Sequence, residues 1–140
     1  MKPKAFLFLL RVIMGWLFLY AGFSHITTPG WSAAGFLNGA KTFPAFFHAL
    51  TAPQILPMVN LANEWALVLL GVSLIAGLFV KWSAPLGAVL MLLYYLPGLS
   101  FPHVASGYIV DEHIVYIFAL LYMAAAGAGK AWGLDGKFHS

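Results

Sequence analysis

Four long apolar stretches constrain this chain most, because together they take up more than half of its 140 residues. They run over residues 5–24, 58–79, 83–102 and 109–127. Each is close to the roughly 20 residues that a helix rising about 1.5 Å per residue needs to cross a hydrocarbon layer of about 30 Å. The sequence therefore predicts an all-α integral membrane protein, built as a four-transmembrane-helix bundle in the lipid bilayer.

The composition supports this interpretation. Hydrophobic residues make up 62% of the chain and charged residues 8%, whereas an ordinary soluble domain carries about 25% charged residues. The largest gap between the stretches, residues 26–57, is itself rich in Phe, Ala and Pro. Within it, Ser32 is placed to cap a short helix that runs to about Ala40. We expect a single membrane domain over residues 1–140, with a long outer loop that carries this short helix.

The distribution of lysines predicts the orientation. Four spans place five lysines on one side of the membrane and only Lys41 on the other, and cytoplasmic loops favour Lys and Arg, so both termini are predicted to be cytoplasmic. The five are Lys2, Lys4, Lys81, Lys130 and Lys137. The basic residues are scattered and form no patch, which argues against nucleic acid as a partner. The chain has no cysteine, which excludes disulfides and thiolate chemistry within it.

Small and polar residues form one stripe on each of the first two helices. Arg11, Gly15, Gly22 and His25 share a face of the first helix by their spacing. An Arg inside a span normally points inward or extends toward the nearer headgroups, and glycines allow a neighbouring helix to come close. A similar face of the second helix carries Asn60, Glu64 and Gly71. We therefore expect these glycines to be packing positions.

Glu64 lies about six residues inside its predicted span, where burial disfavours an isolated carboxylate. One interpretation is a neutral Glu64 that is hydrogen-bonded to a neighbouring helix. The other is a group that accepts a proton or orients a ligand. The fourth helix opens with Asp111, Glu112 and His113, for which capping and the helix dipole are the structural alternative.

The predicted topology gathers most histidines and carboxylates at the outer end of the bundle, and Arg11 approaches from below. Three sites could use such residues. For a metal, the chain lacks an HxxxH or ExxH spacing, and a haem would need histidines within the spans, so neither is predicted. The third is a quinone or similar small-molecule pocket with apolar walls and a few polar groups. The candidate pocket residues are Arg11, His25, Glu64, Tyr94, His103, Glu112 and His113.

The chain also resembles a known family. The runs LLRVIMGWLFLYAGFSHI (9–26), SAAGFLNGA (32–40), NEWALVLLGVSLIAGLFVKWSAPLGAVLMLLYYL (63–96) and GYIVDEH (107–113) resemble the DoxX family, especially its DoxD-like branch. The resemblance implies a four-helix membrane protein of a bacterial or archaeal cell. It also implies an association with thiosulfate:quinone oxidoreductase or quinol oxidase complexes.

On positions that match the family pattern, the resemblance assigns roles to Arg11, Gly15, Gly22, Glu64, Gly71 and Gly77, the four glycines as packing positions. The family often has Lys where this chain has His25, which puts an anion-binding role there in doubt.

The leading hypothesis is a DoxD-like membrane subunit of a quinone-linked redox system, with thiosulfate:quinone oxidoreductase as its specific form. Its implied partners are other membrane redox subunits, and quinone is its implied cofactor, with no covalently bound group. The alternative is a non-catalytic accessory or scaffold subunit of a larger membrane complex. A third hypothesis, proton or solute passage from Arg11 to Glu64, needs a water-filled route that four helices seldom leave.

Overall fold

The computed structural model describes residues 2–105 and 107–138, which are mostly helical. Four helices are long: α1 (Pro3–Thr27), α4 (Leu56–Ala76), α5 (Val80–Gly98) and α6 (Glu112–Ala125). Four are short: α2 (Ala34–Asn38), α3 (Pro44–Ala49), the 3-10 turn η1 (Ala128–Lys130) and α7 (Asp135–Phe138). Two strands, β1 (His103–Val104) and β2 (Gly107–Tyr108), pair antiparallel between α5 and α6.

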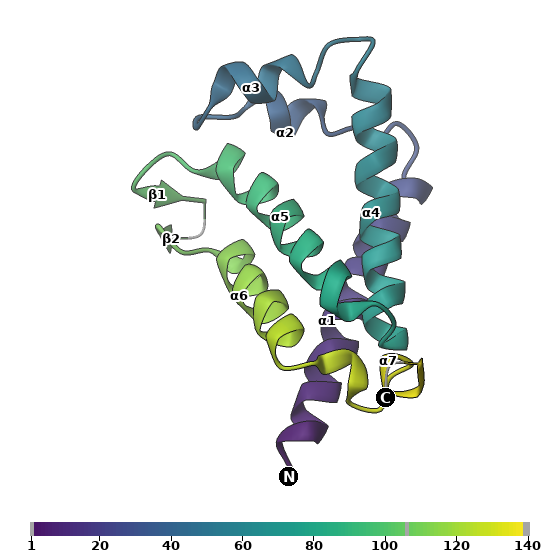
Figure 1. Ribbon diagram of the computed structural model, residues 1–140. Helices are drawn as coiled ribbons and strands as arrows, with labels where there is room; N and C mark the ends of the chain where they lie inside the picture. The colour runs from purple at the N-terminus through teal and green to yellow at the C-terminus, as the bar shows by residue number, and fades with distance from the viewer. Residues whose placement is uncertain (1, 106, 139–140) are drawn as a thin grey trace.

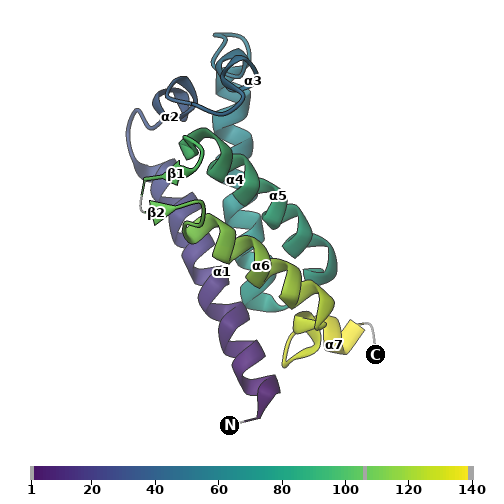
Figure 2. The same cartoon turned by 90° about the vertical axis from the view of Figure 1, so that its left-hand side faces the viewer.

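The long helices form two pairs that diverge toward one end. α1 packs along α4, and α5 packs along α6. The pairs meet near η1 and α7, and they separate toward α2 and α3 (Figure 1). Figure 2 shows that the described chain ends lie together, at the end opposite α2 and α3. A core that includes Phe18, Leu67, Met91 and Leu120 joins the pairs.

Glycines set the close approach of α1 to α4. A Cβ on Gly71 would lie 2.5 Å from the Leu19 nitrogen and 2.7 Å from the Gly15 carbonyl oxygen. A Cβ on Gly22 would lie 2.9 Å from the Glu64 carbonyl oxygen. Because backbone atoms cannot move aside as a flexible side chain can, these positions hold the helices at a distance that only glycine permits.

The turn from α4 to α5 is fixed by the C-terminal segment of the chain. α4 ends at Gly77, whose φ of 69° is left-handed, a conformation that glycine adopts without steric cost. The Asp135 carboxylate then accepts the first N–H groups of α5, from Phe79 at 2.7 Å and Val80 at 3.0 Å. This cap explains why α5 begins at Val80, three residues before the predicted span.

The four predicted spans correspond to the four long helices. Among the described residues, however, only α1 and α4 are long and apolar enough to cross a membrane, judged by length and composition. α5 has 19 residues and contains Pro85 and Pro97. α6 has 14 residues, about 21 Å at the usual rise per residue, so the predicted span 109–127 is too long. The outer loop holds two short helices where one was predicted, and the β1–β2 hairpin was not predicted at all.

Candidate functional site

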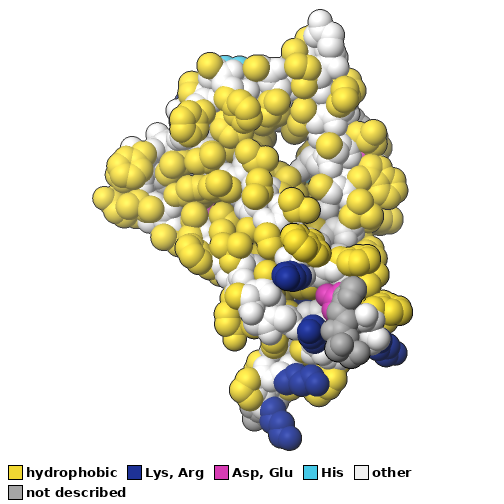
Figure 3. Space-filling view, viewed as in Figure 1, with side chains coloured by type: hydrophobic (Ala, Val, Ile, Leu, Met, Phe, Trp, Pro, Cys, Tyr) yellow, Lys and Arg dark blue, Asp and Glu magenta, His cyan; other side chains and the backbone are white. Residues whose placement is uncertain are grey.

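A pocket of about 230 Å³ lies at the end of the bundle where the helix pairs diverge. The space-filling view is hollowed between α4 and α5 at this end (Figure 3). The residues that line the pocket come from α1, the outer loop and helices α2, α4, α5 and α6: His25, Trp31, Ser32, Ala33, Phe36, Asn63, Tyr94 and His113. Aromatic surface thus alternates with a few polar groups, as in small-molecule sites generally.

A hydrogen-bonded chain of three side chains forms one wall of this pocket. The Tyr94 hydroxyl donates to Asn63 Oδ1. The Asn63 amide nitrogen lies 3.4 Å from His25 Nδ1, within reach of a weak hydrogen bond. His25 also stacks on Trp31, with ring centroids 4.0 Å apart and planes 12° apart. The wall therefore joins α5, α4 and α1 and holds the His25 ring in one orientation.

His113 and Asp111 form the facing polar group. The Asp111 carboxylate caps α6, accepting from the backbone N–H of His113 at 2.9 Å and of Ile114 at 3.4 Å. Its second oxygen lies 3.0 Å from His113 Nδ1. A carboxylate accepts only, so Nδ1 carries the proton and Nε2 of the neutral ring is the acceptor. His113 thus lines the pocket with a defined tautomer.

The outer loop covers the pocket and is tied to α4 by Asn60. Asn60 Oδ1 accepts from the Ala33 backbone N–H at 2.9 Å, and the Asn60 amide donates to Ser32 Oγ at 3.2 Å. Phe36 then meets Tyr94 edge to face, with centroids 6.2 Å apart. The loop therefore adds aromatic surface over the polar wall.

Three of the seven candidate residues line the pocket: His25, Tyr94 and His113. Glu64 is half-buried and close enough to His25 for an electrostatic interaction, but it is not a lining residue. His103 and Glu112 are exposed. His103 lies on the β1–β2 hairpin and Glu112 in the first turn of α6, and neither is a lining residue of the pocket.

Arg11 lies at the other end of the bundle, so grouping it with the pocket was incorrect. It is fully buried, and its guanidinium donates to the carbonyl of Leu74, to that of Ile75 at 2.9 Å and to that of Ala131 at 3.0 Å. Leu74 and Ile75 lie in the last turn of α4, whose final carbonyls have no partner within the helix. Arg11 therefore neither extends to headgroups nor faces Glu64; it ties α1 to the end of α4 and to the C-terminal segment.

The sequence reasoning missed Asn63, Trp31 and Phe36 as pocket residues. One signal was present for the amide: Asn60 and Asn63 are one turn apart on a mostly apolar helix, so two amides lie close together and must find partners. Trp31 and Phe36 lie in the outer loop, and the spacing of apolar residues does not predict that this loop folds back over the helices.

The ligand atoms of Asp111, Glu112 and His113 all lie within 4.8 Å of one another, close enough for a cation. However, both Asp111 oxygens already accept hydrogen bonds in the α6 cap. We therefore assign this cluster to the start of the helix and to the orientation of His113.

Comparison with known proteins places the chain in a family. A family model described as DoxX matches residues 6–97, which include most of α1, all of α2 to α4 and nearly all of α5. No match was found among curated proteins or among solved structures.

Proposed function

The chain belongs to the DoxX family of membrane proteins, and from this premise we propose that it is the quinone-binding membrane subunit of a quinone-linked redox system. The observation that carries the proposal is the pocket between the helix pairs, with its hydrogen-bonded wall of Tyr94, Asn63 and His25 facing His113. Substrate and electron donor are the finer parts of the proposal.

We further propose that α1, α4, α5 and α6 all cross the bilayer of a prokaryotic cell, as one membrane domain, with both termini in the cytoplasm. The support is the distribution of charge. Lysines gather at the end of the molecule with the described chain ends (Figure 3), whereas Lys41 donates its backbone N–H to Pro97 at the far end of α5. The short α6 then reaches across with the help of η1, or with local thinning of the bilayer.

The pocket fits the headgroup of a quinone. At about 230 Å³ it is smaller than the roughly 300–1,000 Å³ of sites that enclose a whole drug-sized ligand, so it suits one ring and not a long isoprenoid tail. A planar ring can lie between the aromatic side chains, and the hollow between α4 and α5 gives the tail a route to lipid (Figure 3). Ring stacking and edge contacts of this kind contribute roughly 0.5–1.5 kcal/mol each.

The polar groups suit the two carbonyl oxygens of such a ring. A bound quinone supplies a two-electron, two-proton acceptor. At one oxygen, the donor is His25 Nε2, because Nδ1 of that ring accepts from the Asn63 amide, which the Tyr94 hydroxyl orients in turn. At the other, Nε2 of His113 is the acceptor that the Asp111 contact leaves free, and it would accept the hydroxyl proton of the reduced ring. Glu64, half-buried beside His25, is the group we propose for proton exchange with the site.

Electrons must come from outside this chain's side chains, since it has no cysteine for sulfur chemistry. We propose thiosulfate as the electron donor, in line with the DoxD-like branch. Thiosulfate would pass its electrons to the quinone either directly or through a partner redox subunit. The two electrons released when two thiosulfates join as tetrathionate reduce one quinone, with two protons from the pocket side.

The experiment is binding of a decyl-substituted benzoquinone to the purified full chain, measured by calorimetry. Tyr94→Phe removes the hydroxyl that orients Asn63 and, through it, the His25 ring, and its expected effect is roughly tenfold weaker binding, since a hydrogen bond is worth about 1 kcal/mol. Tyr122→Phe is the matched control, because Tyr122 is 60% exposed on α6, and it should bind as the parent does. Equal weakening by both variants, or no binding by the parent, would remove the quinone proposal.

Reduction of the same quinone with thiosulfate, with and without co-purified partners, tests the finer proposal. If quinone binds but no preparation reduces it, the chain is better described as a non-catalytic accessory subunit. Migration of all of the protein within one large complex, in native electrophoresis with mild detergent, would support that description.

A further inference from the structure

A second and larger pocket lies at the opposite end of the bundle, and the proposed function does not use it. Its volume is about 500 Å³. The lining comes from the start of α5, from the end of α6 and from the segment that follows: Phe79, Lys81, Trp82, Ala124, Ala125, Gly127, Gly129, Lys130 and Asp135. We propose that this pocket binds the headgroup of an anionic phospholipid.

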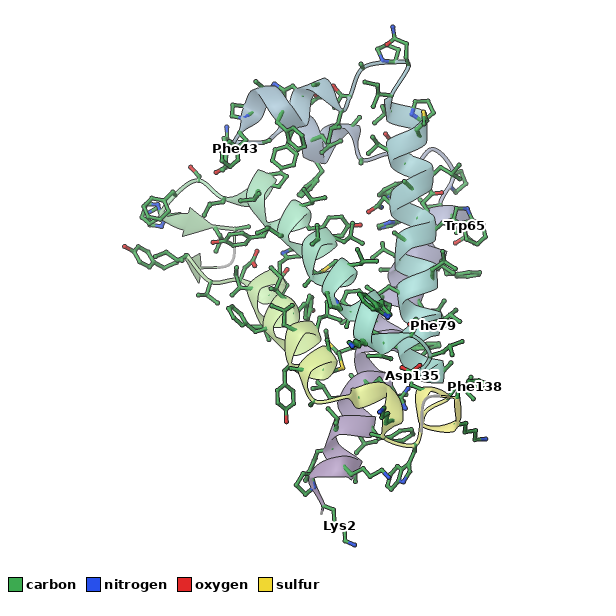
Figure 4. The ribbon with its side chains drawn as sticks, in the orientation of Figure 1. Lys2, Phe43, Trp65, Phe79, Asp135 and Phe138 are labelled. Carbon is green, nitrogen blue, oxygen red and sulfur yellow. The ribbon has the colours of Figure 1, made fainter. Side chains whose placement is uncertain are left out.

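The charge of the pocket favours an anion. Lys81 and Lys130 are exposed at its edge. The one carboxylate, Asp135, is buried and accepts the first N–H groups of α5, and it lies beside Phe79 at the turn between α4 and α5 (Figure 4). The other three acidic residues of the chain lie on α4 or at the start of α6. Within residues 2–105 and 107–138, no acidic side chain forms an ion pair with either lysine, so both can meet a ligand phosphate.

The surroundings identify that ligand as a lipid. Lys81 lies 5.5 Å from the Trp82 ring centroid, and paired Trp and Lys side chains are typical of the level of the headgroups. From the pocket, Trp82, Leu86 and Val89 continue along one face of α5, and they are 67%, 71% and 56% exposed. A phosphate held by the lysines would thus place acyl chains along an apolar stripe. Basic pockets between helices recognise anionic lipids in this way.

Gly127 and Gly129 shape the pocket floor. Gly127 has a φ of 66°, and a Cβ on Gly129 would overlap the Asp135 carboxylate. The chain can therefore turn sharply from α6 into η1, which ends at Lys130, and both Lys130 and Lys81 line the pocket.

The test is native mass spectrometry of the full chain in detergent, titrated separately with phosphatidylglycerol and phosphatidylcholine. We expect phosphatidylglycerol to bind on the order of tenfold more tightly, and the variant with Lys81→Gln and Lys130→Gln to lose this preference. The variant with Lys2→Gln and Lys4→Gln is the control, because it removes the same charge from the same end outside the pocket. It should keep the preference, as should the variant with Lys81→Arg and Lys130→Arg.

Equal loss in the glutamine variant and its control would overturn the proposal, since it would show only general attraction to a basic surface. Displacement of the lipid by inorganic phosphate at equal concentration would also overturn it, because the site would then select a free anion. A photoactivatable phosphatidylglycerol bound to the unaltered protein gives an independent measurement. Its cross-links should fall within residues 79–89 and 124–130, and cross-links elsewhere would contradict the assignment.

Discussion

Arg11 is fully buried, and its charge is compensated by three backbone carbonyls and by the nearby Asp135. Replacing it by Met would keep much of the volume but leave the Ile75 and Ala131 carbonyls without the donors that Arg11 supplies in this buried site. We expect Arg11→Met to lower the free energy of unfolding by about 3 kcal/mol, since each unsatisfied buried group costs roughly 1–3 kcal/mol. Unfolding of the detergent-solubilised protein by a denaturing detergent measures this.

Lys2→Met provides the matched control for Arg11→Met. Lys2 is exposed at the start of α1, so its loss should change stability by no more than about 0.5 kcal/mol. Arg11→Lys should recover only part of the loss, because an ammonium cannot reach three carbonyls with the fixed fork of a guanidinium. If Arg11→Met were no worse than Lys2→Met, the three carbonyl contacts would not matter to the fold.

At the scale of residues, the sequence predicted the pocket in part. His25, Tyr94 and His113 could be named because polar side chains in apolar helices must find partners. Arg11 was misplaced because its partners lie far away in the chain: Leu74 and Ile75 at the end of α4, and Ala131 and Asp135 in the C-terminal segment. The contacts of Arg11 depend on how the C-terminal segment folds back onto α1 and α4. The spacing of residues along one helix does not predict that fold.

At the scale of helices, the contact between α1 and α4 depends on Gly71. A methyl group there would meet backbone atoms of Leu19 and Gly15, so the helices would have to separate. We expect Gly71→Ala to destabilise the protein by roughly 1–3 kcal/mol, the usual cost of overpacking. Gly35→Ala in α2 is the control, because nothing lies within 4 Å of its added carbon, and it should be neutral. Thermal unfolding of both variants compares them, and equal melting temperatures would contradict the packing argument.

The start of α6 depends on the Asp111 cap. Asn caps helices about as well as Asp, whereas Ala costs about 1 kcal/mol. We therefore expect Asp111→Asn to keep the stability of the parent and Asp111→Ala to lose about 1 kcal/mol, as measured by chemical unfolding. If the quinone proposal holds, Asp111→Asn should still weaken turnover, since His113 loses its carboxylate partner. A stable variant with full turnover would assign Asp111 to the cap alone.

Element positions were well predicted and their ends less so. The apolar stretches of the sequence located all four long helices. The ends depend on tertiary contacts instead: Asp135 starts α5 early, and Gly77 ends α4. The β1–β2 hairpin has two residues per strand. Strands this short cannot show the alternation of polar and apolar residues by which a strand is predicted.

At the scale of the whole molecule, charge and ligand-binding features separate along the long axis. The basic end holds Arg11 and the lysine-edged pocket, and the other end holds the aromatic pocket and the outer loop (Figures 1 and 3). Such an asymmetry gives the protein one orientation in a bilayer. The two proposed sites lie at opposite ends of the molecule, so we expect loss of one site to leave the other intact.

The absence of cysteine makes this orientation directly testable, because any single cysteine added is a unique label. We expect Lys41→Cys, between α2 and α3, to react with a membrane-impermeant maleimide in intact cells. Lys2→Cys and Lys137→Cys, at the other end, should react only after the membrane is permeabilised. Labelling of Lys2→Cys and Lys137→Cys on opposite sides would mean an odd number of spans and contradict the four-span proposal. Labelling of all three with the sides exchanged would keep the bundle but reverse its orientation, and would place the aromatic pocket at the cytoplasmic face.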